Sequence, residues 1–183
     1  GALMASVRVR PARLADEPAI RDLLAPAVAA GEVLPRAVVA GDFLVAEDPD
    51  GIVGAVALTA WTDRVVELGS LVAARKGRGL GARLVQAALD EAARLGFQEV
   101  VALTALDKWF ARRGFVVEPV APWSLARSTP VLVQPPLEDS PVLEATAAKA
   151  RRSCARCPRL ARCQQVLMRQ PAPAVDHRHL RVA

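Results

Sequence analysis

The sequence predicts a chain of the α/β (α+β) class, in which strands and helices alternate along 183 residues. Three observations support this prediction. The apolar run Val65–Val72, within a strand predicted over Asp63–Val72, is typical of a buried strand, and an amphipathic helix follows it. A segment with three alternating glycines separates the two. The turn sequence Asp48-Pro49-Asp50-Gly51 lies between the apolar runs Phe43–Ala46 and Ile52–Leu58, which predicts a β-hairpin.

The N-terminal elements are predicted from alternation and capping residues. Val7–Arg10 alternates as a short strand does, and Pro11 ends it. Asp16-Glu17-Pro18 then opens a helix, because an acidic cap and a proline in the first turn are typical of helix starts. After Gly31 an irregular or helical piece carries Leu34-Pro35-Arg36.

Further elements follow the glycine-rich segment. Its helix is predicted to end at Gly96, and five apolar residues fall on one face of it: Leu80, Leu84, Ala88, Ala92 and Leu95. Gln98–Thr104 predicts a strand, Asp107–Arg113 a short helix, and Phe115 begins a last strand before proline-rich loops. These elements make up a domain over residues 6–135, with a basic, helical, cysteine-containing appendage over 136–183.

The glycine-rich segment Arg75–Gly81 has the composition of a phosphate-binding loop. Glycine lets the backbone approach an anion closely, and the first turn of the next helix directs unpaired N–H groups at it. Lys76 and Arg78 add positive charge. The segment lacks the Gly-Lys-Ser/Thr of an ATP-binding loop and the glycine spacing of a dinucleotide-binding loop. The alternative is a glycine-rich turn that only caps a helix.

The pattern Lys76-x-x-Gly79-x-Gly81 resembles the Gln/Arg-x-x-Gly-x-Gly/Ala loop of the GCN5-related N-acetyltransferases (GNAT). This resemblance implies a mixed, mostly antiparallel sheet flanked by helices, with the acetyl-CoA loop between strand 4 and the following helix. It also implies a strand N–H near Leu71 as the donor to the oxyanion. The implied acetyl-CoA contacts are Leu71, Val72, Lys76, Gly77, Arg78, Gly79, Leu80, Gly81 and Ala82.

Within that family, several motifs are similar to those of the short, kinase-free N-acetylglutamate synthases. They are Leu34-Pro35-Arg36, Asp42–Glu47, Val66–Val72, Leu103-Thr104 and Trp109–Phe115. The resemblance implies transfer of the acetyl group of acetyl-CoA to the amine of L-glutamate, a step of arginine biosynthesis. Arg36, Arg113 and Arg127 are the implied carboxylate ligands, since arginine binds carboxylates bidentately. An acetyltransferase for another amine, and a non-catalytic acyl-CoA-binding regulatory module, remain alternatives.

Glu67 is the predicted general base. Only the neutral form of an amine attacks a thioester, so a base must take the proton, and both histidines lie in the tail. The alternative is an outward-facing strand glutamate paired with a cation such as Arg64. Tyrosine, which protonates the leaving thiolate in the resembling enzymes, is absent from the chain.

Three cysteines in the appendage are candidate metal ligands. Cys154, Cys157 and Cys163, with His177, could complete a tetrahedral zinc shell with a structural role. The surrounding arginines are expected to favour the thiolate form. Inert cysteines in an arginine-rich segment are the alternative.

The net charge of +5 is concentrated near the C-terminus, where nine Lys or Arg face two acids from residue 144 onward. Nucleic-acid binding is not favoured, because the basic tail lacks interleaved aromatic residues. We expect a cytoplasmic protein without a membrane span, since no export signal follows Met4 and no apolar run reaches ~18 residues. The expected partners are an amino acid and acetyl-CoA, with a homodimer as an open possibility.

Overall fold

The computed structural model describes residues 6–128 and 140–175, and these form two compact units. Unit 1 contains the described residues up to Thr59 together with Leu68–Glu91. Unit 2 contains Ala60–Glu67 and the described residues from Ala92 onward. Strand β4 (Val65–Ala73) passes from unit 2 into unit 1, so each unit holds a part of it.

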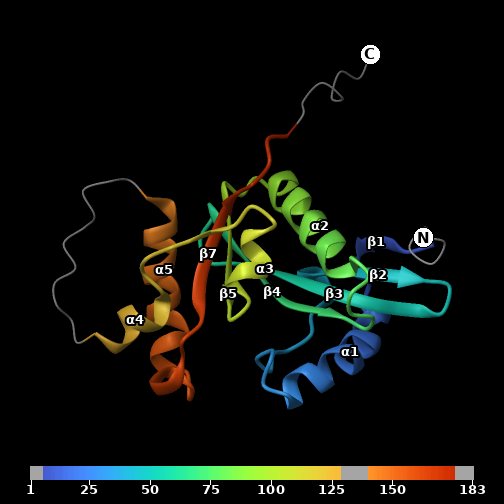
Figure 1. The fold of residues 1–183 in the computed structure, drawn as a ribbon, viewed down its shortest axis with the longest axis horizontal. Coiled ribbons are helices and arrows are strands. Elements are labelled where there is room, and N and C mark those ends of the chain that lie inside the picture. The colour runs from blue at the N-terminus through green and yellow to red at the C-terminus, as the bar shows by residue number, and fades with distance from the viewer. Residues whose placement is uncertain (1–5, 129–139, 176–183) are drawn as a thin grey trace. The chain divides into compact units, whose positions relative to one another are not determined.

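The strands are hydrogen-bonded in the order β1-β2-β3-β4-β5-β7-β6. The pairs β1-β2, β2-β3, β5-β7 and β6-β7 are antiparallel, whereas β4 and β5 run parallel. Helices flank this sheet (Figure 1). The predicted mixed, mostly antiparallel sheet with flanking helices is therefore confirmed.

Unit 1 is built on a three-strand meander and two helices. Its elements are β1 (Arg8–Pro11), the 3-10 turn η1 (Leu14–Asp16), α1 (Glu17–Ala29), η2 (Ala40–Asp42), β2 (Phe43–Asp48), β3 (Gly51–Ala60) and most of α2 (Leu80–Arg94). The hairpin turn between β2 and β3 lies where the sequence predicts it, with Gly51 in the left-handed region at φ 128°. The predicted helix start is also confirmed, because α1 begins at Glu17 with Pro18 in its first turn.

The two helices of unit 1 pack on opposite faces of β2 and β3 (Figure 1). Ile20 and Leu24 of α1 pack with the side chains of one face, among them Val45 and Ala55. On the other face, a Cβ atom at Gly54 would lie 2.8 Å from Leu84 Cδ1 of α2. Glycine at position 54 therefore permits the close approach of α2 to the sheet.

Unit 2 combines the first part of β4 with the described residues from Ala92 onward. Its elements are β5 (Glu99–Thr104), α3 (Asp107–Ala111), β6 (Val116–Val117), α4 (Pro122–Arg127), α5 (Pro141–Arg152), the 3-10 turns η3 (Cys154–Arg156) and η4 (Leu160–Arg162), and β7 (Val166–Pro171). Val65, Val66 and Glu67 of β4 pair with β5, and β7 pairs with β5 along its whole length.

The core of unit 2 contains side chains from strands β4, β5 and β7 and from helix α5. Trp61 is only 3% exposed and packs with Val65 of β4, Leu167 of β7, and Val142 and Ala145 of α5. Helix α5 thus belongs to this core because it buries an apolar stripe of small residues. Its N-terminus is capped as expected for such a helix, since the Ser140 side chain accepts a hydrogen bond from the Leu143 N–H at 3.3 Å.

Several sequence predictions differ from the structure. Leu95 lies beyond the end of α2 and is 53% exposed, although Leu80, Leu84, Ala88 and Ala92 are buried as predicted. Strand β7 was not predicted, because its sequence lies in an arginine-rich segment. The predicted domain boundary between residues 135 and 136 lies outside the described residues. Among residues 6–128 and 140–175, no helix is long and apolar enough to cross a membrane.

An ion cluster holds the start of α1 to the edge of the sheet. Arg10 of β1 donates to Asp16 Oδ2 at 2.7 Å and to Glu47 Oε2 at 2.9 Å. Asp16 also accepts from the Arg13 N–H at 2.7 Å, and its side chain is only 13% exposed. The hydrogen bonds from Arg10 lower the pKa of Asp16 from 3.8 to about 2.

We expect Asp16→Asn to lower the free energy of unfolding by about 2 kcal/mol at pH 7, since one pKa unit corresponds to ~1.4 kcal/mol. The carboxyl pKa is lowered on folding, so the stabilisation is present above pH 3.8 and declines as the pH falls toward about 2. Urea unfolding between pH 7 and pH 3 measures this. Asp22→Asn, at an exposed position of α1, is the control. A loss in Asp16→Asn that stays constant over that range would contradict the prediction.

Candidate active site

The glycine-rich loop adopts the backbone conformation that its glycines permit. Gly77 has φ 77° and Gly79 has φ 76°, so both lie in the left-handed region. Lys76, which precedes Gly77, and Arg78, between the two glycines, are exposed. The loop therefore keeps its cationic side chains at the surface while the backbone turns sharply into α2.

Helix α2 begins directly after this loop, at Leu80. The Arg83 N–H donates to the Gly79 carbonyl at 3.1 Å, which is the first hydrogen bond of the helix. The N–H groups of Gly79, Leu80, Gly81 and Ala82 consequently have no acceptor within the helix. With the positive end of the helix dipole and two nearby cations, they form a site suited to a phosphate group.

Strand β4 leads into the loop and contains a backbone irregularity. Ser70 has φ 47°, and it is the one non-glycine residue with positive φ among the described residues. A left-handed residue inside a strand disturbs the regular ladder and is a feature often found at functional sites. It immediately precedes Leu71, the predicted oxyanion donor, and no sequence pattern indicated it.

Glu67, the predicted base, lies on β4 within unit 2. Its Oε1 accepts a hydrogen bond from Trp61 Nε1 at 2.8 Å and lies 3.4 Å from Lys149 Nζ. Its side chain is 19% exposed. Among the described residues no donor reaches Oε2, so this oxygen remains for a water molecule or an amine.

The cation paired with Glu67 is not the one that the sequence suggested. Arg64 Nη2 pairs with Glu144 Oε2 of α5 at 3.1 Å, whereas Glu67 pairs with Lys149 from the same helix. Sequence analysis missed both Lys149 and Trp61 as neighbours of the base. Lys149 is 82 residues from Glu67 in the chain, and no local pattern relates the two.

Arg36, a predicted substrate ligand, lies in unit 1 after α1. Its guanidinium pairs with Asp42 Oδ2 at 3.0 Å, donates to Thr59 Oγ1 at 3.3 Å, and stacks 5.0 Å from the centroid of the Phe43 ring. It also lines a shallow hollow between α1 and the segment 34–38, together with Arg21 and apolar side chains. Two arginines beside apolar walls suit a small carboxylate-bearing molecule.

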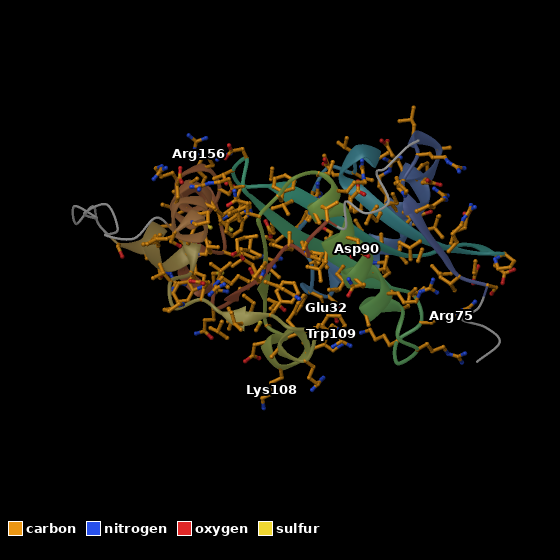
Figure 2. All side chains as sticks on the ribbon, turned by 90° about the horizontal axis from the view of Figure 1, so that it is seen from above. Glu32, Arg75, Asp90, Lys108, Trp109 and Arg156 are labelled. Atoms are coloured by element: carbon orange, nitrogen blue, oxygen red, sulfur yellow. The ribbon has the colours of Figure 1, made fainter. Side chains whose placement is uncertain are left out.

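Arg113, the second predicted ligand, follows α3 in unit 2. Its guanidinium carbon lies 3.4 Å from the centroid of the Trp109 ring, and Nη1 donates to the Trp109 carbonyl at 2.7 Å. Its Nε is buried and has no hydrogen-bond partner in residues 6–128 and 140–175, and burial lowers the pKa of the guanidinium from its usual value. In Figure 2, Trp109 and Lys108 both come from α3, and exposed Lys108 extends outward.

Arg127, the third predicted ligand, is engaged with the backbone of the cysteine segment. Its guanidinium donates to the Leu160 carbonyl and, at 2.9 Å, to the Cys163 carbonyl. It also stacks 4.4 Å from the centroid of the Trp123 ring. No hydrogen bond or ion pair of the described chain joins Arg127 to Glu67 or Arg113. These contacts give Arg127 a structural role in holding η4 to α4.

The predicted zinc shell does not form among the described residues. Cys154, Cys157 and Cys163 are half-buried free thiols, and no group of three or more metal-binding side chains occurs in residues 6–128 and 140–175. His177 lies outside those residues. Burial raises the pKa of the Cys154 thiol, with Lys149 acting in the opposite direction. Burial therefore outweighs the effect of the nearby cation on this thiol.

The comparisons with known proteins agree with this fold. Residues 19–115 match the acetyltransferase (GNAT) family. The chain belongs to that family. The match ends before α4 and α5, so it includes the glycine loop and Glu67 but not Lys149.

Three of the similar solved structures illustrate the likeness. Rv2747 from Mycobacterium tuberculosis, in complex with CoA and a second ligand, is 25% identical, with a TM-score of 0.65 over 90% of this chain and 98% of its own. N-acetylglutamate synthase from Neisseria gonorrhoeae, complexed with coenzyme A and N-acetyl-glutamate, is 22% identical, with a TM-score of 0.65 over 91% of this chain. The same enzyme complexed with coenzyme A and L-arginine is 20% identical, with a TM-score of 0.58 over 90%. This chain spans only about a third of the Neisseria enzyme, 35% and 33% in the two comparisons.

We expect Gly79→Asp to weaken acetyl-CoA binding by about 100-fold or more, because a carboxylate would repel phosphate groups at the start of α2. Gly79→Asn is the matched control, since asparagine has nearly the same shape and also tolerates positive φ. Its affinity should fall by less than about 10-fold. Isothermal titration with acetyl-CoA measures both variants, and equal affinities for the two would exclude a phosphate site at the loop.

Proposed function

We propose that this chain is an acetyl-CoA-dependent amino-acid N-acetyltransferase, and that its acceptor is L-glutamate. Membership of the acetyltransferase family supports acetyl transfer. Within the structure, the proposal rests on the carboxylate of Glu67, whose Oε1 accepts from Trp61 and pairs with Lys149, while Oε2 has no donor among the described residues. It lies on the same strand that continues into the glycine loop.

The loop and the start of α2 are the proposed site for the phosphates of acetyl-CoA. The N–H groups of Gly79 to Ala82, with Lys76 and Arg78, would hold the pyrophosphate there. Leu71 and Val72, at the end of β4, would bind the acetyl-carrying arm of acetyl-CoA through backbone hydrogen bonds. The thioester supplies the acetyl group and needs no enzyme nucleophile.

The acceptor nitrogen loses two protons in the reaction. The ammonium group loses the first proton to Glu67 Oε2, directly or through a water molecule, and the neutral amine then attacks the thioester carbonyl. The new bond is C–N, and the C–S bond breaks when the tetrahedral intermediate collapses. The backbone N–H of Leu71 would stabilise the oxyanion of that intermediate. The nitrogen gives up its second proton during the collapse, and this proton converts the leaving thiolate to coenzyme A, while the proton on Glu67 returns to solvent.

The choice of glutamate rests on cations and on similar proteins. In unit 1, Arg36 lies beside a hollow with apolar walls and pairs with Asp42. In unit 2, the buried Nε–H of Arg113 has no partner among the described residues. Because arginine binds carboxylates bidentately, each is a candidate ligand for the acceptor. Two of the similar structures are of an N-acetylglutamate synthase, one of them with N-acetyl-glutamate bound. Arg127 contributes least to the proposal, because its donors already hold backbone carbonyls.

The acceptor is tested by measuring thiol release from acetyl-CoA with single amines. L-Glutamate should give the highest kcat/KM among glutamate, glutamine, aspartate and lysine, and mass spectrometry should identify acetylglutamate. Release with another amine alone would support a different acetyltransferase. Acetyl-CoA binding without any release would support a non-catalytic module.

We expect Glu67→Gln to lower kcat by roughly 10²- to 10⁴-fold, the usual contribution of a general base, while the affinity for acetyl-CoA stays within about two-fold. Steady-state kinetics between pH 7 and pH 9 measures the change. Glu32→Gln is the control, because Glu32 is an exposed glutamate outside the helices and strands. A Glu67→Gln variant with full activity over that pH range would exclude the base role.

A further inference from the structure

The side of α5 that faces the core of unit 2 ends in a lysine. Val142 and Ala145 of this helix pack against Trp61 and Val65, and all four are buried. Lys149 lies four residues after Ala145, so it continues the same helical face by one turn. Its aliphatic stem therefore runs along the buried face, and its side chain is only 23% exposed.

The ammonium group of Lys149 meets two groups of the candidate site. Nζ lies 3.4 Å from Glu67 Oε1 and 5.6 Å from the centroid of the Trp61 ring. Trp61 itself donates Nε1–H to the same Oε1 at 2.8 Å. Glu67, Trp61 and Lys149 thus form a closed set of three contacts, which we call the Glu67 clamp.

The Glu67 clamp has a defined effect on the carboxylate. Rotation about the last bond of a glutamate side chain is nearly free unless contacts restrict it. Here both donors bind Oε1, so they restrict the rotation of the carboxylate, and no donor in the described part of the chain reaches Oε2. A proton acceptor held in one orientation is the arrangement that general-base catalysis needs.

Helix α5 is held in place by further contacts with the same short segment, Ala60–Glu67. Arg152 Nη2 donates to the Trp61 carbonyl at 2.6 Å, and Glu144 pairs with Arg64 at 3.1 Å. Together with Lys149, these residues join both ends and the middle of α5 to the segment that carries the base. The position of the Lys149 ammonium is therefore determined by a packed helix rather than by a free surface side chain.

We propose that Lys149 is a positioning residue for Glu67, so that α5, beyond the residues matched by the acetyltransferase family, completes the active site. This inference rests on the proposed function only in taking Glu67 as the base. Both side chains of the Lys149–Glu67 pair are mostly covered, so removing the lysine charge should lower stability as well as turnover. Activities are therefore compared at a temperature well below the unfolding midpoint of each variant.

The kinetic test compares three variants of the full chain, with thiol release from acetyl-CoA and L-glutamate as the assay. Lys149→Met keeps the apolar stem and removes the charge, and kcat should fall by about 10- to 100-fold because the base loses its fixed orientation. The KM for acetyl-CoA should stay within about two-fold. Lys149→Arg should recover kcat to within about three-fold of the unchanged chain, since it restores a cation that donates to Oε1. Arg151→Met, an exposed neighbour on α5, is the control and should behave as the unchanged chain.

A second measurement does not depend on the acceptor. The chain has three tryptophans, so ¹⁵N-labelled protein gives three indole N–H signals, and Trp61→Phe identifies that of Trp61. This signal should move in Glu67→Gln and in Lys149→Met, because both changes alter the acceptor of the indole N–H. It should stay in place in Arg151→Met.

The two measurements separate the inference from the proposed function. If Glu67→Gln loses activity while Lys149→Met keeps kcat and the Trp61 signal, Lys149 does not position the base and the inference is overturned. Equal losses of kcat in Lys149→Met and Arg151→Met would overturn it as well. If glutamate is not a substrate of any form, the proposed acceptor is wrong, and the assay moves to the amine that is acetylated.

Discussion

Burial of strand β4 is the constraint on which the rest of the structure depends. Val65, Val66 and Leu68 are almost completely inaccessible, and Glu67 lies between the last two in the chain. A strand alternates its side chains, so Glu67 shares a face with Val65, whereas Val66 and Leu68 lie on the opposite face. Apolar residues thus bury both faces of β4 around the carboxylate. The same strand continues through Ser70 into the glycine loop. Hydrophobic burial thus supports both the candidate base and the candidate phosphate site.

The carboxylate of Glu67 on this strand is stabilised by a hydrogen bond and an ion pair. The carboxylate of Glu67 would be costly to cover alone, and Trp61 and Lys149 compensate for the water that it loses. Arg113 differs, because burial lowers its pKa and its Nε has no partner within the described chain. The carboxylate of Glu67 is therefore hydrogen-bonded, whereas one buried donor of Arg113 is not.

The predicted elements that depend on local signals agree with the structure. The start of α1 follows from Asp16-Glu17-Pro18, the β2-β3 turn from Asp48-Pro49-Asp50-Gly51, and the loop before α2 from its glycines. The prediction that Leu95 lies on the apolar face of the helix was wrong, because α2 ends at Arg94. Helix ends are set by capping as much as by periodicity. The sequence did not reveal strand β7, because its pairing with β5 is a long-range interaction. The strand has no alternation strong enough to reveal it.

In the cysteine segment too, the sequence suggested a chemical property that depends on tertiary structure. Its spacing suggests metal ligands, and its arginines suggest reactive thiolates. In the structure, burial raises the pKa of Cys154, and Arg127 uses its guanidinium to hold the backbone at Leu160 and Cys163. Spacing reports which side chains can approach one another, whereas burial decides whether they ionise.

The sequence by itself determined the class of the fold and the glycines that let the loop turn into α2. These depend on interactions between residues close in the chain, namely strand alternation and the freedom of glycine at positive φ. The phosphate site and the role of Glu67 as base stay predictions. The tertiary structure alone decided what surrounds Glu67. Trp61 and Lys149 meet the same carboxylate oxygen only because α5 packs its apolar face on the core of unit 2. That packing joins residues far apart in the chain, and long-range contacts leave no periodic trace in a single sequence.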